Sequence, residues 1–264
     1  MRGFSRLARN FTGIGVVLAL LLAVTFLSPD NSLKDVQAAG TLGACVPPSY
    51  PPLVTGDVDR PGVDIELLKA VATHLGVGLS LNPNDAIGRD FNPLNWGLNR
   101  AQCQVIAGGV VDSDQTRSFL GTGPSYAETG WAILSPQDLA GLKGLNIGVL
   151  TLVSGLDRIG LANYLRSAGA RVQVVRRPEE LVAGIAEHRF DAGITEALLA
   201  TRLAADNHWV AAWMPTEVAR YNLVFGLWKG DVTLKRAINQ AFADLTADGT
   251  IAAILARYAG APLD

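Results

Sequence analysis

From residue 41 onward, short apolar runs alternate with stretches in which apolar residues recur every three or four positions. The first pattern is typical of buried β-strands and the second of amphipathic helices. The apolar runs are residues 41–46, 105–107, 131–134, 145–150, 172–175, 190–194 and 221–227. Because the runs alternate with helical stretches, the pattern predicts an α/β fold in which helices cross over between the strands of a sheet.

The expected helices follow the apolar runs. One begins near Asp64 and stops at Gly76, one opens at Ser154-Gly155, one begins at Pro178 and one begins near Glu196. Their beginnings carry Pro, Ser or acidic residues, which favour a helix N-terminus. The clearest apolar faces comprise Ile65, Leu68, Ala72 and Leu75 in the first of these helices and Leu234, Ile238, Phe242 and Leu245 near the C-terminus.

The elements group into two α/β units followed by a helical C-terminal part. We therefore predict two lobes, with residues 40–132 and 225–264 in lobe one and residues 133–224 in lobe two. If the C-terminal part packs on the first unit, the chain crosses between the lobes twice. Two crossover strands of this kind form a hinge about a cleft.

The N-terminus has the composition of an export signal. Arg2, Arg6 and Arg9 precede an apolar run from Ile14 to Leu27, which is short for a membrane span. Residues 36–38, Val-Gln-Ala, suit cleavage by a signal peptidase, so we assign residues 1–39 to a signal peptide. An uncleaved N-terminal anchor is the alternative, and both place the rest of the chain in the periplasm.

The chain has two cysteines, Cys45 and Cys103. An even pair in an oxidising compartment predicts a disulfide. Two unrelated thiols are an alternative, and residues 42–45 (Leu-Gly-Ala-Cys) also resemble a lipidation motif. Charged residues between the apolar run and Cys45, among them Lys34 and Asp35, disfavour lipidation.

The charge pattern excludes several classes of protein. The net charge is −2, and residues of both signs, 17% of the chain, are interspersed, which disfavours nucleic acid as a partner. The three histidines, His74, His188 and His208, lie on different elements, so we expect no metal site. We find no nucleotide-binding or hydrolase motif and expect no cofactor, no enzymatic activity and a monomer.

A series of short motifs, in order along residues 41–260, resembles the periplasmic solute-binding proteins of family 3, which serve amino-acid ABC importers. These motifs are residues 50–53 (YPPL), 62–67 (GVDIEL), 116–117 (TR), 123–126 (GPSY), 138–141 (DLAG), 147–149 (IGV), 190–192 (FDA) and 234–249. The resemblance implies a two-lobed type II periplasmic-binding-protein-like fold. It also implies a small polar, amino-acid-like ligand and a membrane permease as the partner.

A finer resemblance concerns the cysteines. A Cys in the first strand together with one at the position of Cys103 is similar to the branch found beside periplasmic quinoprotein (methanol) dehydrogenases. The matching stretch is residues 98–105, in which Gln104 replaces the usual Asp. This resemblance implies an alternative function, that of an accessory protein of such a dehydrogenase.

Two charged residues match the family's ligand contacts. The resemblance implies that Arg117 binds the ligand's carboxylate, which a guanidinium can do through paired donors. It implies that Glu196 binds the ligand's ammonium, where the family has Asp. The alternatives are a surface arginine at a helix start and an acid that complements a helix dipole.

Further residues are expected to line the cleft. Ser154 and Gly155 would present helix N-terminal amides to an anion, with Ser154 also an N-cap. Aromatic side chains would wall the ligand, and glycines would let it approach the backbone. These residues are Tyr50, Tyr126, Gly108 and Gly109.

Asp112 departs from the family, which tends to have Ser or Thr nearby, because its carboxylate would repel a carboxylate ligand. Either Asp112 points away as a helix cap, or the ligand is not an ordinary amino acid.

A few dehydratases share this fold and have a motif of the form T-D-x-x-E. The corresponding stretch here is residues 195–199, Thr-Glu-Ala-Leu-Leu. It lacks the final Glu, which disfavours an enzyme of that class.

Overall fold

The computed structural model describes residues 16–18, 30–87, 92–151, 156–258 and 263. The chain comprises an N-terminal unit, residues 1–31, and a folded body, residues 32–264. None of the helices in the described ranges has both the length and the apolar character that a membrane span requires.

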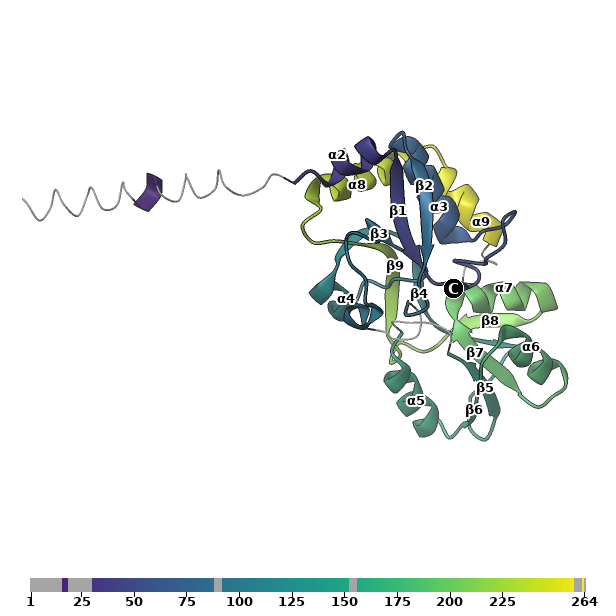
Figure 1. The fold of residues 1–264 in the computed structure, drawn as a ribbon. Coiled ribbons are helices and arrows are strands. Elements are labelled where there is room, and N and C mark those ends of the chain that lie inside the picture. The colour runs from purple at the N-terminus through teal and green to yellow at the C-terminus, as the bar shows by residue number, and fades with distance from the viewer. Residues whose placement is uncertain (1–15, 19–29, 88–91, 152–155, 259–262, 264) are drawn as a thin grey trace, which may run out of the picture. The chain divides into compact units, whose positions relative to one another are not determined.

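The body has two lobes (Figure 1). The sheet of lobe one has the order β2-β1-β3-β9-β4, in which β1 is parallel to β2 and β3 and β9 is antiparallel to β3 and β4. Its strands are β1 (Thr41–Val46), β2 (Gly78–Pro83), β3 (Val105–Ile106), β9 (Arg220–Leu227) and the first part of β4 (Gly121–Ser135). Its helices are α2 (Ser32–Ala39), α3 (Val63–His74), α4 (Asp114–Phe119), α8 (Val232–Ala247) and α9 (Thr250–Tyr258), with a 3-10 turn at Pro93–Trp96.

Lobe two is built on the second part of β4. Here β4 pairs with β7 and β8, and β5 lies parallel between β7 and β6. The strands are β5 (Asn146–Leu150), β6 (Arg171–Val175), β7 (Ala192–Glu196) and β8 (Val210–Trp213). The helices are α5 (Arg158–Ser167), α6 (Pro178–Ala186) and α7 (Ala197–Asn207).

Two strands join the lobes. From Gly121 to Gly130, β4 pairs with β9, and from Trp131 onward it pairs with β7. β9 carries the chain back into lobe one. The predicted α/β fold with two crossover strands is confirmed. β9 already pairs within lobe one at Arg220, five residues before the return at residue 225 that the sequence suggested.

The apolar faces predicted from periodicity face the core of lobe one. Leu234, Ile238 and Phe242 of α8 are at most 3% exposed, and on α3 Leu68 is fully buried. Burial of such side chains is the main favourable term in folding. The amphipathic pattern therefore orients these helices on the sheet.

Helix α2 changes the expected boundary of the folded body. Val36 is 2% exposed and lies in the core, and the Ser32 hydroxyl accepts a hydrogen bond from the Leu234 amide at 3.2 Å. Asp231, the N-cap of α8, makes no side-chain capping bond, so Ser32 satisfies a donor at that helix end. Residues 32–39, which the sequence suggested belong to the signal, therefore fold with lobe one.

We expect a chain that starts at Gly40 to be about 2–3 kcal/mol less stable than one that starts at Asp30. The loss combines a helix cap with the burial of one valine. Thermal unfolding of the two chains measures the difference. Equal melting temperatures would show that α2 adds nothing to the body.

Candidate functional site

A cluster of buried polar side chains lies where the lobes meet. Lobe one contributes Tyr50, Asp64 and Tyr126, lobe two contributes Glu196, and Thr129 comes from β4. All five residues are at most 7% exposed, and we call them the cleft cluster. Burying a charged group costs free energy unless the group is hydrogen-bonded or paired. The cluster is therefore a candidate functional site.

Asp64 holds the loop that follows β3. Its Oδ2 accepts hydrogen bonds from the amides of Gly108 at 2.6 Å and Gly109 at 3.2 Å, and its Oδ1 accepts from the Tyr126 hydroxyl at 2.6 Å. Burial raises the pKa of Asp64 to about 6, although these bonds oppose the rise. The sequence predicted that α3 begins near Asp64; the helix begins at Val63 with Gly62 as the N-cap, and the Asp64 side chain is buried and makes no capping bond.

Glu196 ends β7 and caps α7. The Thr129 hydroxyl donates to its Oε1 at 2.5 Å, and the Leu199 amide donates to its Oε2 at 3.0 Å. Burial raises the pKa of Glu196, hydrogen bonds lower it, and the negative charge of Asp64 raises it further. The helix-terminus role that the sequence offered as an alternative is therefore confirmed, and a ligand role for Glu196 stays a prediction.

Tyr50 lies within electrostatic range of both carboxylates. It is 5% exposed, and its hydroxyl has no hydrogen-bond partner among the described residues. Burial raises the pKa of Tyr50, as do the charges of Glu196 and Asp64, whereas Arg158 lowers it. A buried hydroxyl without a partner is uncommon in native structures, so the Tyr50 hydroxyl is able to bind a further polar group.

The two glycines after β3 make room for side chains of the protein itself. A Cβ on Gly108 would lie 2.1 Å from the Pro47 ring, and one on Gly109 would lie 2.3 Å from the Tyr50 ring. Both glycines have positive φ, and both amides bind Asp64. Pro47 and Tyr50 therefore occupy the space next to the two glycines in which a ligand was expected.

The structure does not bring Arg117 into the cleft cluster. Its side chain is half-exposed on α4 and pairs with Asp112 and Asp114, each at 2.7 Å. Hydrogen bonds to Asp114 and Asp112 raise the pKa of Arg117. Asp112 is not the helix cap either, because Ser113 caps α4 through the Thr116 amide.

Tyr126 lies in the cleft cluster, where it donates to Asp64 and its ring is 5.3 Å from that of Phe225. Ser154 and Gly155 lie outside the described residues. The helix that was expected to open there begins at Arg158, with Asp157 as the N-cap.

The sequence patterns did not indicate two residues of this region, Thr129 and Arg158. Thr129 belongs to a long extended strand, and its contact with Glu196 spans 67 positions. Arg158 is the first residue of α5, beyond the carboxyl end of β5, and donates to the Thr151 carbonyl at 3.1 Å. Its place after a strand end could have identified it, since ligands of open α/β sheets bind there.

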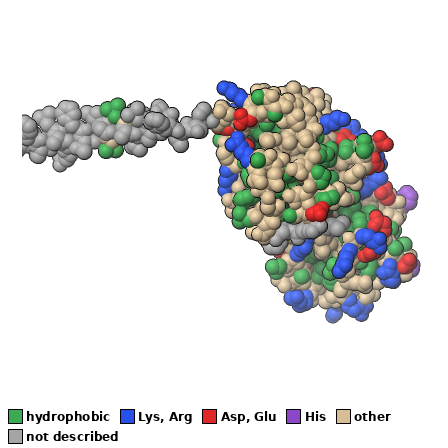
Figure 2. Space-filling model, viewed as in Figure 1, with side chains coloured by type: hydrophobic (Ala, Val, Ile, Leu, Met, Phe, Trp, Pro, Cys, Tyr) green, Lys and Arg blue, Asp and Glu red, His purple; other side chains and the backbone are tan. Residues whose placement is uncertain are grey.

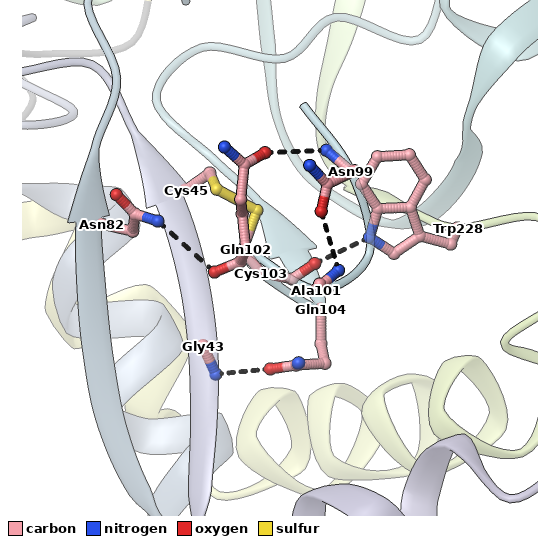
Figure 3. The surroundings of a disulfide bond; sticks show 9 residues. All are labelled: Gly43, Cys45, Asn82, Asn99, Ala101, Gln102, Cys103, Gln104 and Trp228. Carbon is pink, nitrogen blue, oxygen red and sulfur yellow. Dashed lines mark hydrogen bonds between the residues drawn. A yellow bond between two sulfur atoms is a disulfide. The ribbon is translucent and has the colours of Figure 1, made fainter. Parts of the chain in front are cut away.

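The predicted disulfide between Cys45 and Cys103 is present and buried (Figure 3). It joins β1 to the segment before β3. Beside it, the Trp228 indole donates to the Cys103 carbonyl at 2.7 Å. The side chain of Gln104 accepts from the Gly43 amide at 2.9 Å, so it binds the neighbouring strand.

Comparisons with known proteins agree with this architecture. Residues 42–261 match the sequence model of the bacterial extracellular solute-binding proteins, family 3. The L-cystine-binding protein TcyJ of Escherichia coli (strain K12) is 26% identical over 259 residues, which cover 94% of this chain and 93% of TcyJ.

Solved structures give the same fold. An ancestral cationic amino acid solute binding protein, AncCDT-1, aligns with a TM-score of 0.72 at 21% identity over 86% of this chain and 99% of its own. An ancestral arginine-binding protein bound to arginine aligns with a TM-score of 0.61 at 24% identity over 83% and 98%. These likenesses show the two-lobed type II fold.

Proposed function

Because the chain belongs to family 3 of the bacterial extracellular solute-binding proteins, we propose that it works in the periplasm as the receptor of an ABC importer. It closes its lobes on a small, amino-acid-like solute and delivers that solute to the permease. The observation that carries the proposal is the cleft cluster, in which the buried Glu196 of lobe two lies within electrostatic range of Tyr50 and Asp64 of lobe one.

The cluster suits a ligand with an ammonium group. Burial raises the pKa of both Asp64 and Glu196, and the charge of Asp64 raises the pKa of Glu196 further, so a cation between the lobes would favour their charged forms. The hydroxyl of Tyr50 can accept or donate a further hydrogen bond. Glu196 is therefore the residue to which we assign the ligand's ammonium.

The ligand's carboxylate has several candidate partners. Arg158 places a guanidinium near Tyr50 on the lobe-two side. Ser154 and Gly155 precede the same helix and remain proposed contacts. Arg117 would reach a ligand only by leaving Asp112 and Asp114, so we place it after Arg158 as a carboxylate partner.

The mechanism is hinge closure. β4 and β9 link the lobes, and the open form exposes the cleft cluster to solute. A ligand that contacts both lobes binds the closed form more tightly, and it shifts the population by that difference in affinity. The permease then distinguishes the closed form from the open one.

A thermal-shift screen of amino acids tests the proposal. A ligand at a hundredfold excess over its Kd should add about 2.7 kcal/mol to the free energy of unfolding. Glu196→Gln should weaken that ligand by about 10- to 100-fold, because a charged hydrogen bond is replaced by a neutral one.

Glu128→Gln is the matched control, since Glu128 is exposed on β4, next to Thr129, and carries the same charge. Equal affinity in both variants would refute the role of Glu196. No stabilisation by any amino acid would refute the proposed ligand class.

The second candidate function is that of an accessory protein of a periplasmic quinoprotein dehydrogenase. The disulfide between Cys45 and Cys103 favours it, since that pair carries the finer resemblance. Co-purification with a dehydrogenase, without stabilisation by amino acids, would favour this candidate over the importer receptor.

A further inference from the structure

Lobe two has an apolar groove beside its outermost strand. The groove lies between α5 and β6 and has a volume of about 440 Å³. Its lining is mostly aliphatic, with one threonine and two arginines: Val149, Thr151, Arg158, Leu161, Ala162, Leu165, Arg166, Ala170, Val172 and Val174. It lies outside the cleft cluster, since none of the five residues of that cluster lines it.

The groove exists because α5 covers only part of the sheet. Leu161 and Leu165 of α5 are buried, as is Val149 of β5. In the next strand, Val172 is 48% exposed and Val174 is 61% exposed. Val149 pairs with Val174 in the parallel register, so buried and exposed valines line one face of the sheet. The apolar floor thus runs from under the helix out to solvent.

β6 is also the edge of the sheet. It ends the strand order, and among the described strands it pairs with β5 alone. The far side of its backbone therefore presents amide and carbonyl groups to pair with another chain. Proteins commonly protect such edges, and an exposed edge with apolar side chains is a site for strand addition.

The charge at the groove has one sign. Among the described residues, Arg158 and Arg166 line it and no acidic residue does. The side chain of Arg166 donates to the amide oxygen of Asn163. Because this acceptor is neutral, the bond does not neutralise the positive charge of Arg166. In Figure 2, Lys and Arg side chains gather along the lower edge of the molecule, where α5 and β6 lie in Figure 1. The groove therefore suits an acidic partner.

We propose that the groove between α5 and β6 seats an extended, acidic segment of a partner protein, which adds as a strand to the edge of β6. Alternate apolar side chains of the segment lie on Val172 and Val174, and its carboxylates meet Arg158 and Arg166. A small ligand suits the site less well, because pockets bury most of a small ligand and this floor is half-exposed. A second copy of the chain would set arginine against arginine.

The groove adjoins the cleft through Arg158. This residue lines the groove, and its charge also lowers the pKa of Tyr50 in the cleft cluster. The proposal does not depend on the identity of the small ligand, so it can be tested separately.

Fluorescence anisotropy of a labelled octapeptide, in which valine alternates with aspartate and glutamate, tests the proposal on the full chain. The acidic peptide should bind, and a matched peptide with lysine in place of the acids should not. Val174→Asp should weaken binding about tenfold, since it removes an apolar contact and repels the peptide. Raising the ionic strength from about 0.05 M to about 0.5 M should weaken binding as well.

Val210→Asp is the control for folding and for charge. Val210 lies on β8, is 41% exposed in the same lobe and is not part of the groove. Amide hydrogen exchange should show that the peptide protects β6 and leaves β8 unchanged. Absence of binding, equal binding of the two peptides or an equal effect of the two variants would overturn the proposal. So would self-association of the wild-type chain that Val174→Asp abolishes, because it would identify a second copy as the occupant.

Discussion

Asp64→Ala should lower the free energy of unfolding by about 4 kcal/mol at neutral pH. The substitution leaves the amides of Gly108 and Gly109 and the hydroxyl of Tyr126 without their acceptor. A buried donor that loses its partner costs about 1–3 kcal/mol, and removing a buried charge returns part of that sum. Urea unfolding of the purified variant measures the loss.

Asp64→Asn is the matched variant. An amide of the same shape can still accept from the two glycines and can donate to Tyr126. We expect it to be at least as stable as the wild type at pH 7, because it keeps the hydrogen bonds and avoids the buried charge, and this would attribute the loss in Asp64→Ala to the orphaned donors. If both variants were equally unstable, the negative charge itself would be the essential feature.

The same pair of chains gives a pH signature. The pKa of Asp64 is about 6 in the folded chain against an ordinary value of 3.8, so as the pH falls the folded state takes up its proton first. The contribution of Asp64 to stability is therefore complete below about pH 4 and is lost as the pH rises through about 6. The change is about 3 kcal/mol. Asp64→Asn should lack this component, and an identical pH profile would contradict the assignment.

Removing the disulfide should cost about as much. Cys45 and Cys103 are 58 positions apart, so their bond closes a long loop in the unfolded chain. In the chain-entropy model a loop of that length contributes about 4 kcal/mol. Urea unfolding of the Cys45→Ala, Cys103→Ala double variant should show the loss.

A reductant provides the control for this second prediction. It should destabilise the wild-type chain and leave the double variant unchanged, because only the wild type has a bond to reduce. A loss below about 1 kcal/mol would mean that the unfolded chain is already compact in this region. The core around Trp96 and Leu98 would then supply the local stability.

The cleft is where sequence and structure differ most. The resemblance assigned the ligand's carboxylate to Arg117, yet Asp112 and Asp114 occupy its guanidinium. The ligand was expected to approach the backbone at Gly108 and Gly109, yet Pro47 and Tyr50 fill that space. Glu196 was expected at this place and lies there, together with Thr129, which no pattern indicated. Motif order located the region of the site but not the contacts within it.

The sequence by itself determined the alternation of strands and helices, the disulfide and the family. Periodicity reports which side of a helix or strand is apolar, and that property is local; the face of α8 that carries Ile238 is an example. Because the chain has two cysteines, each can form an intramolecular disulfide only with the other. These features depend on residues close together in the sequence or on the number of cysteines, so they can be predicted from the sequence alone.

Only the tertiary structure decided what the polar side chains face. Asp64 meets Tyr126 across 62 positions, Ser32 meets Leu234 across 202, and α5 leaves Val172 and Val174 of β6 exposed. Such contacts arise from how elements pack, and a charged residue is compatible with many partners until packing excludes all but a few. The geometry of the cleft and the exposed edge of lobe two therefore follow from the fold and not from any single stretch of the chain.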